Sequence, residues 1–350
     1  MGICGIWHCR MFPNILRPIG RIYGKDAVID ESDLELAKTV AAISSGQVRA
    51  GAKLISRIER CEEGLGPILK ALYRVGGRTR VIGITGPPGA GKSTLIGRLI
   101  GHWRKAGLRV AVLAVDPSSP FTGGAVLGDR VRMSDHSSDD GVFIRSMASR
   151  GQLGGLARAA ADAITVLDAM PWDVLLVETV GVGQNETDIM RLASVVVLLQ
   201  TPMGGDDIQA AKAGITEIGD IFVVNKCDHP EADRTARLLE EMIALGCRLH
   251  TDRTWRPPVL KTRAVAGEGV AELAREIDNC FSALAQSPAQ ANARLRARIG
   301  HQISEIVRDQ LDRRMKSNQS RWMDALIDPV MSRSSDPYSM AEQLLARLGA

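Results

Sequence analysis

From about residue 79 to residue 287, short apolar runs alternate with stretches of helical periodicity, and this alternation restricts the possible folds more than any other feature. Several runs are apolar at nearly every position, as strands are when helices cover both faces of their sheet. The order of strands and helices predicts an α/β domain over residues 79–287, with a doubly wound, mainly parallel sheet. The predicted strands are residues 80–85, 110–115, 142–144, 173–178, 195–200, 221–225 and 259–261.

Helical patterns without strands flank this domain on both sides. Residues 30–78 predict an N-terminal helical segment, which is broken at residues 44–46. Residues 288–350 predict a C-terminal helical arm, because helical spacing continues to about residue 328 and a second short helix follows Pro337. The apolar face of this arm needs a partner, which is either its own domain or a second subunit.

Residues 1–29 are predicted to be a leader that precedes the folded part of the chain. The first 25 residues contain Arg10, Arg17, Arg21 and Lys25 but no acid, as transit peptides do. The scarcity of serine and the weak amphipathicity favour a poorly ordered leader instead. We therefore expect a cytoplasmic protein, or one of the mitochondrial matrix if the leader is a transit peptide.

The composition favours a protein without nucleic-acid or membrane partners. The chain has 44 basic and 40 acidic residues, and the resulting charge of +4 is too small to indicate a polyanionic partner. No apolar run approaches the roughly 20 residues that cross a bilayer. The six cysteines form no Cys-x-x-Cys pair, which favours reduced thiols over a disulfide framework.

A glycine-rich motif follows the first predicted strand and opens a helix. It fits the phosphate-loop pattern G-x-x-x-x-G-K-[ST], whose backbone N–H groups surround the phosphates of a nucleotide. Lys92 is expected to contact the β and γ phosphates, and Ser93 to offer its hydroxyl to Mg²⁺. The predicted nucleotide-binding residues here are Gly86, Pro87, Pro88, Gly89, Ala90, Gly91, Lys92, Ser93 and Thr94.

Carboxylates that follow neighbouring strands are the candidates for holding the magnesium ion. Glu178 ends an apolar strand and opens the sequence ETVG, which stands where GTPases often carry Asp-x-x-Gly at the start of a switch. Asp116 ends another strand, and Asp129 lies in the glycine-rich, charged loop after it. The predicted metal site therefore consists of Ser93, Asp116, Asp129 and Glu178.

The sequence NKCD at residues 225–228 directly follows an apolar strand and predicts a guanine-reading loop. The Asp228 carboxylate can accept hydrogen bonds from N1–H and the N2 amine of guanine, which adenine does not offer in that geometry. Lys226 can lie across the base, and Asn225 can tie the loop back to the phosphate loop. A second base loop is predicted after the last strand, at Thr262, Arg263, Ala264 and Val265.

In combination, these motifs resemble the MeaB-type GTPases, which include the methylmalonyl-CoA mutase-associated chaperones and proteins formerly labelled arginine/ornithine transport kinases. The resemblance covers about residues 80–285, and its motifs are highly specific when taken together. The matching stretches are GITGPPGAGKST at 83–94, VDPSSPFTGGAVLGDRVRM at 115–133, SRGQLGGLARA at 149–159, VETVGVGQNE at 177–186, GGDDIQAAKAGITEIGD at 204–220 and VNKCD at 224–228.

The resemblance implies a homodimeric GTPase that assists an adenosylcobalamin-dependent acyl-CoA mutase. Such a protein would gate the delivery of cofactor and help to protect or reactivate the mutase, and its C-terminal helices would form a dimerisation arm. The family's metal and switch positions fall on Ser93, Asp116, Asp129 and Glu178. A further nucleotide-responsive loop of the family falls on residues 204–214, which include Lys212.

The predicted reaction is the hydrolysis of GTP to GDP and phosphate by a positioned water that attacks in line. No Gln directly follows Gly181, and Gln184 is the nearest one within the expected switch, so we expect slow turnover without a partner. Rival functions are a kinase, a nickel or cobalt insertion GTPase, and a regulatory module that never hydrolyses its nucleotide. The candidate catalytic residues are Lys92, Asp116, Asp129, Glu178, Gln184 and Lys212.

Overall fold

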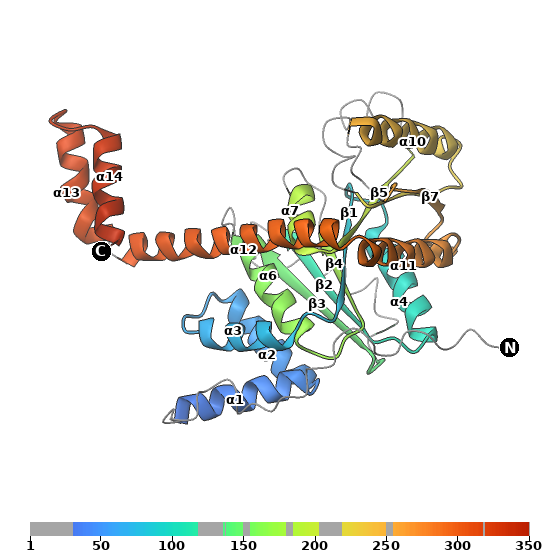
Figure 1. Ribbon diagram of the computed structural model, residues 1–350, viewed down its shortest axis with the longest axis horizontal. Coiled ribbons are helices and arrows are strands. Elements are labelled where there is room, and N and C mark those ends of the chain that lie inside the picture. The colour runs from blue at the N-terminus through green and yellow to red at the C-terminus, as the bar shows by residue number, and fades with distance from the viewer. Residues whose placement is uncertain are drawn as a thin grey trace.

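The computed structural model describes residues 31–117, 136, 138–149, 155–179, 185–202, 219–249, 255–317 and 319–349. A central β-sheet carries helices on both faces, and helices before and after it in the chain complete the structure (Figure 1). This arrangement confirms the predicted α/β fold class. The predicted leader, residues 1–29, lies outside the described residues.

The sheet has seven strands in the order β3-β2-β4-β1-β5-β6-β7, and every pairing between them is parallel. All seven predicted strands are confirmed. The central strand β1 lies between β4 and β5, and ligands of such sheets bind beyond the carboxyl ends of the strands. The strands are β1 (Arg80–Thr85), β2 (Val110–Pro117), β3 (Val142–Ser149), β4 (Val174–Thr179), β5 (Val195–Gln200), β6 (Ile221–Asn225) and β7 (Val259–Thr262).

Strands β2 and β3 are longer than the sequence pattern predicted. They pair without interruption from Val110 and Val142 to Pro117 and Ser149. The charge of Arg145 interrupts the apolar pattern of β3, although its guanidinium pairs with Glu59 at the end of the neighbouring helix α2 (Val48–Glu59). A helix that supplies a carboxylate therefore allows a charged residue within the strand.

Two buried apolar clusters occupy the two faces of the sheet. One contains side chains of α4 (Lys92–Lys105) and α11 (Val270–Gln286), including Leu95, Leu99 and Ile277. The other contains side chains of α6 (Gly155–Asp168), α7 (Asn185–Leu192) and α10 (Ala232–Leu249). The near-continuous apolar strands follow from this two-sided burial.

The N-terminal helices extend the second of these clusters. They are α1 (Glu31–Ser44), α2 and α3 (Gly66–Val75), and the predicted break at residues 44–46 coincides with the end of α1. Ile43, Ile55 and Leu72 are fully buried in the same cluster as side chains of α6. These helices are thus packed into the core beside the sheet.

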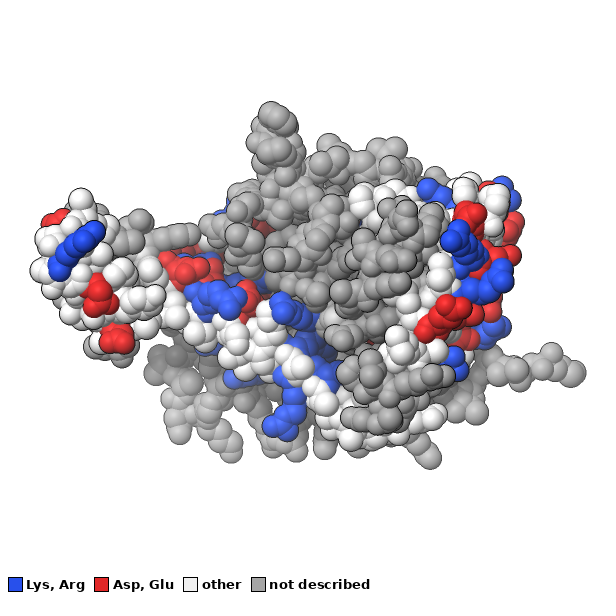
Figure 2. Space-filling model, turned by 90° about the horizontal axis from the view of Figure 1, so that it is seen from above, with Lys and Arg blue, Asp and Glu red and all other residues white. Residues whose placement is uncertain are grey.

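The C-terminal helices are α12 (Pro288–Ser317), α13 (Gln319–Met331) and α14 (Pro337–Gly349). Helix α12 crosses the body and carries α13 and α14 away from it (Figure 1). Seen from above, the described side chains of this face mix basic and acidic residues, with basic ones gathered over the middle of the molecule (Figure 2). Among the described residues, no helix is both long and apolar enough to cross a membrane.

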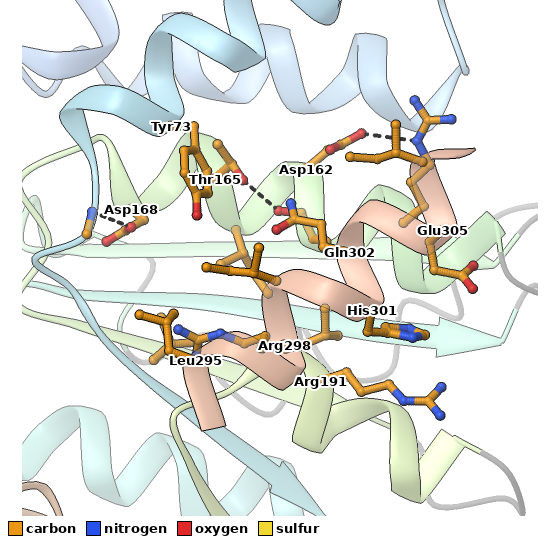
Figure 3. A pocket seen from close by; sticks show the side chains of 18 residues that line it. Tyr73, Asp162, Thr165, Asp168, Arg191, Leu295, Arg298, His301, Gln302 and Glu305 are labelled. Atoms are coloured by element: carbon orange, nitrogen blue, oxygen red, sulfur yellow. Dashed lines mark hydrogen bonds and ion pairs between the residues drawn. The ribbon is translucent and has the colours of Figure 1, made fainter. Parts of the chain in front are cut away.

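A cavity of about 370 Å³ lies between α12 and the body, lined also by residues of α3, α6 and α7 (Figure 3). Asp162 and Arg158 of α6 face it as an ion pair, with 3.7 Å between Oδ2 and Nε. Burial raises the pKa of Asp162 to about 6 and lowers the pKa values of Arg158 and of Arg298 on α12. Helix α12 therefore packs against partly buried charged side chains as well as apolar ones.

Candidate nucleotide site

The phosphate loop joins the end of β1 to the start of α4, as its motif predicts. Gly86 and Gly91 both have positive φ angles, of 142° and 91°. A Cβ atom at Gly86 would lie 2.3 Å from the carbonyl oxygen of Leu199, and one at Gly91 would lie 2.4 Å from Nδ2 of Asn225. Glycine is thus required at both ends of the loop by the close approach of neighbouring strands.

Lys92 is folded back over this loop. Its Nζ donates to the carbonyl oxygens of Gly86, at 2.8 Å, and Pro87, at 3.1 Å. The side chain is largely buried, with 7% of its surface exposed. The loop carbonyls hold the ammonium group of Lys92 at the N-terminus of α4. The positive charge of Lys92 therefore lies beside the backbone that would surround a phosphate.

Ser93 and Glu178 meet in a buried hydrogen bond. The Ser93 Oγ donates to Oε1 of Glu178 at 2.8 Å, and each residue is only 4% exposed. Ser93 lies in the first turn of α4, while Glu178 is near the end of β4, the strand that pairs with β1. The contact joins a hydroxyl and a carboxylate, which are oxygen ligands of the kind that Mg²⁺ prefers.

The remaining predicted metal and catalytic residues are only partly within the described structure. Ala114 of β2 pairs with Glu178, so Asp116 follows two residues further toward the same edge of the sheet. Only the backbone of Asp116 is described. Asp129, Gln184 and Lys212, together with the loop at 204–214, lie outside the described residues.

Asn225 connects three segments that are far apart in the sequence. Its Nδ2 donates to the carbonyl oxygen of Ala90 in the phosphate loop at 2.7 Å. Its Oδ1 accepts from Oγ1 of Thr262 and from the N–H of Ala264, each at 3.1 Å. Asn225 is 3% exposed. One buried side chain thus fixes the phosphate loop against both predicted base loops.

The exposed ends of the two base loops also lie side by side. Lys226 adopts a φ of 60°, and the Nε atom of Arg263 lies 3.6 Å from Oδ2 of Asp228. The side chains of Arg263 and Asp228 are about half exposed, and Val265 is 75% exposed. The structure therefore brings Asp228 and the second loop to one open surface, where a base could reach them.

Thr262 is the first residue of the predicted second base loop. It ends β7, and its Cα pairs with that of Asn225 at the end of β6. Parallel strands that pair in register end at the same edge of a sheet. Thr262 and Asn225 therefore lie next to each other. The register of the sheet thus brings the two base loops together.

A phosphate loop, a buried hydroxyl–carboxylate pair and a base loop tied to the phosphate loop define the class of P-loop GTPases. A family model described as "Methylmalonyl Co-A mutase-associated GTPase MeaB" matches residues 52–320. The chain belongs to this MeaB family, and it is a GTPase.

Individual relatives agree with this assignment. A Pyrococcus horikoshii protein is 46% identical over 309 residues, which cover 88% of this chain and 97% of the relative. The Escherichia coli GTPase ArgK is 35% identical over 263 residues, or 73% of this chain and 79% of the relative. The mouse "methylmalonic aciduria type A homolog, mitochondrial" is 40% identical over 193 residues, or 55% of this chain and 46% of the relative.

A solved structure supports the fold over nearly the whole chain. The crystal structure of an LAO/AO transport system kinase superposes with a TM-score of 0.61 and 26% identity. The match covers 93% of this chain and all of the other. The fold of this chain is thus similar to that of a protein solved by crystallography.

Changing Asn225 to Ala is expected to weaken GDP binding about tenfold to a hundredfold. The change leaves the buried N–H of Ala264 and the carbonyl of Ala90 without this partner, at a cost of about 1–3 kcal/mol. Titration with a fluorescent GDP analogue measures the effect, and a thermal melt checks the fold. Asn279→Ala, on the exposed face of α11, is the matched control. Equal affinity in wild type and Asn225→Ala would contradict the structural role assigned to this side chain.

Proposed function

We propose that this GTPase acts as a chaperone of an adenosylcobalamin-dependent acyl-CoA mutase. GTP binding and hydrolysis would gate the loading of the cofactor and support the protection and reactivation of the mutase. The family description, which names an association with methylmalonyl-CoA mutase, supports this role. The name of the mouse relative, which refers to methylmalonic aciduria, supports it further. The proposed compartment is the cytoplasm, or the mitochondrial matrix if residues 1–29 are a transit peptide.

The proposed phosphate chemistry uses residues at the carboxyl edge of the sheet. Lys92 would leave the carbonyls of Gly86 and Pro87 and donate to the β and γ phosphates, where it offsets their negative charge. Ser93 and Glu178 would hold Mg²⁺, with Asp116 and Asp129 as the further ligands. The bound ion would supply positive charge to the phosphate oxygens. Gln184 and Lys212 are the proposed catalytic residues of the switch loops.

The proposed base site uses the two loops that Asn225 joins. Asp228 would accept hydrogen bonds from N1–H and N2 of guanine, and Lys226 would lie across the ring. Arg263, Ala264 and Val265 would line the opposite edge. The observation that carries the GTP assignment is the set of three hydrogen bonds of Asn225, which fixes these loops at a constant distance from the phosphate loop.

The chaperone role predicts that the mutase stimulates GTP hydrolysis. Addition of a purified adenosylcobalamin-dependent acyl-CoA mutase should raise the turnover of GTP on the order of tenfold or more, because a partner orders the groups that position the water. Phosphate release in single- and multiple-turnover assays measures this effect. Lys92→Ala is the control, and it should lose roughly 10²–10³ in rate with or without the mutase. Turnover that no such mutase changes would contradict the proposed role.

We propose further that the protein is a homodimer joined through its arm. Helices α13 and α14 carry exposed apolar side chains, among them Met331, Tyr338 and Leu345. These exposed apolar side chains support the proposal that another chain covers this surface. The helices extend away from the body (Figure 1), so a second copy could reach them without contacting the nucleotide site.

Charges placed on this apolar surface are expected to yield monomers that still bind GDP. Light scattering of the variants Met331→Asp and Leu345→Asp tests the proposal, because a buried carboxylate at an interface costs several kcal/mol. Leu34→Asp, at an exposed apolar position of α1, is the control and should leave the mass unchanged. If both arm variants remain dimers, the dimer interface does not lie on α13 and α14.

A further inference from the structure

Arg98 of α4 also contacts the second base loop, which Asn225 holds from within the protein. Its Nε donates to the carbonyl oxygen of Ala264 at 3.1 Å, and its Nη2 donates to that of Val265 at 2.5 Å. The planar guanidinium presents its N–H groups as a rigid fork, so two consecutive carbonyls are held in one orientation. This contact joins the helix that starts at the phosphate loop to the loop beyond β7.

The two carbonyls determine where the neighbouring N–H groups point. In a planar trans peptide, the C=O of one residue and the N–H of the next point in opposite directions. Because Arg98 holds the carbonyl of Ala264, the N–H of Val265 points away from Arg98. Within the described part of the chain, that N–H donates to no protein acceptor, whereas the N–H of Ala266 closes a turn onto Arg263 at 3.0 Å.

The loop is therefore clamped from two sides. Asn225 holds the N–H of Ala264 from within the protein, and Arg98 holds the two carbonyls from outside. The loop closes on itself through paired hydrogen bonds between Arg263 and Glu268. The N–H of Val265, on the exposed surface beside Asp228, is therefore placed to donate a hydrogen bond to a ligand.

We propose that Arg98 is a positioning residue for guanine recognition. By holding the carbonyls of Ala264 and Val265, it directs the N–H of Val265 toward the O6 carbonyl of guanine. Adenine carries an amino group at that carbon, so it would present a donor to a donor. Arg98 thus sharpens the choice of guanine over adenine without touching the base. The inference rests on the proposed base site formed by Asp228 and residues 263–265.

The position of Arg98 allows this role to be tested without disturbing the core. Its side chain borders an open cleft of about 550 Å³, together with Gly97, His102 and Lys105 of the same helix. Its neighbours Leu99 and Ile100 are fully buried, whereas Arg98 is exposed. Replacement of Arg98 therefore removes the two hydrogen bonds and leaves the packing of α4 against the sheet in place.

The test compares nucleotide affinities of Arg98→Ala, Arg98→Lys and the control Lys105→Ala. Arg98→Ala should bind fluorescent GDP about tenfold more weakly, as expected for the loss of one oriented hydrogen bond, and bind ADP with unchanged affinity. The preference for GDP over ADP should fall by the same factor. In hydrolysis, KM for GTP should rise while kcat stays constant. Arg98→Lys, which has one point-like ammonium group, should recover only part of the preference.

Two other outcomes separate the possible failures. If the wild type prefers GDP and Arg98→Ala keeps the same preference, or loses affinity for GDP and ADP equally, the role of Arg98 is overturned while the base site stands. If the wild type itself shows no preference for GDP over ADP, the proposed base site fails, and the inference about Arg98 fails with it.

Discussion

The carboxamide of Asn225 is the point on which the nucleotide site depends. It joins the phosphate loop, the end of β6 and the loop beyond β7 through three hydrogen bonds of 2.7 to 3.1 Å. An amide suits this position because it donates on one side and accepts on the other. A carboxylate could accept from Thr262 and Ala264, but it would repel the carbonyl of Ala90. The geometry of the site thus follows from one neutral, buried side chain at the end of a strand.

The sheet brings the other groups to the same edge. Parallel pairing of β1 with β4 aligns Ser93, just beyond β1, with Glu178 at the end of β4. The pairing of β1 with β5 brings the carbonyl of Leu199 so close to Gly86 that only glycine fits there. Helix α12, by contrast, lies over a cavity that is lined by titratable side chains such as Arg158 and Asp162. The phosphate site is therefore closely packed, whereas the contact between α12 and the body is more polar and encloses a cavity.

Much of this arrangement could be predicted from the sequence. Two-sided burial made the strands read as apolar runs, and the glycine and Asn-Lys-x-Asp motifs marked the loops that follow them. The pattern failed where tertiary contacts override it. The second half of β3 was not predicted, because the charge of Arg145 interrupts the apolar pattern. Its partner Glu59 belongs to a helix that is distant in the sequence. Arg98 was not predicted for the same reason, because it contacts residues that lie 166 and 167 positions further along the chain. Asp129, Gln184 and Lys212 stay predictions.

The most direct test of the central claim is the base preference of Asp228→Asn. Asp228 is expected to accept from N1–H and N2 of guanine, and the amide of Asn would meet the N2 amine with a donor. Xanthine carries an oxygen at that carbon, so the amide would find an acceptor there. Titration of fluorescent GDP and XDP should therefore show GDP affinity falling about tenfold to a hundredfold and XDP affinity rising. If the Asp228→Asn protein keeps the guanine affinity of the wild type, Asp228 does not read the base, and the account of the nucleotide site is wrong.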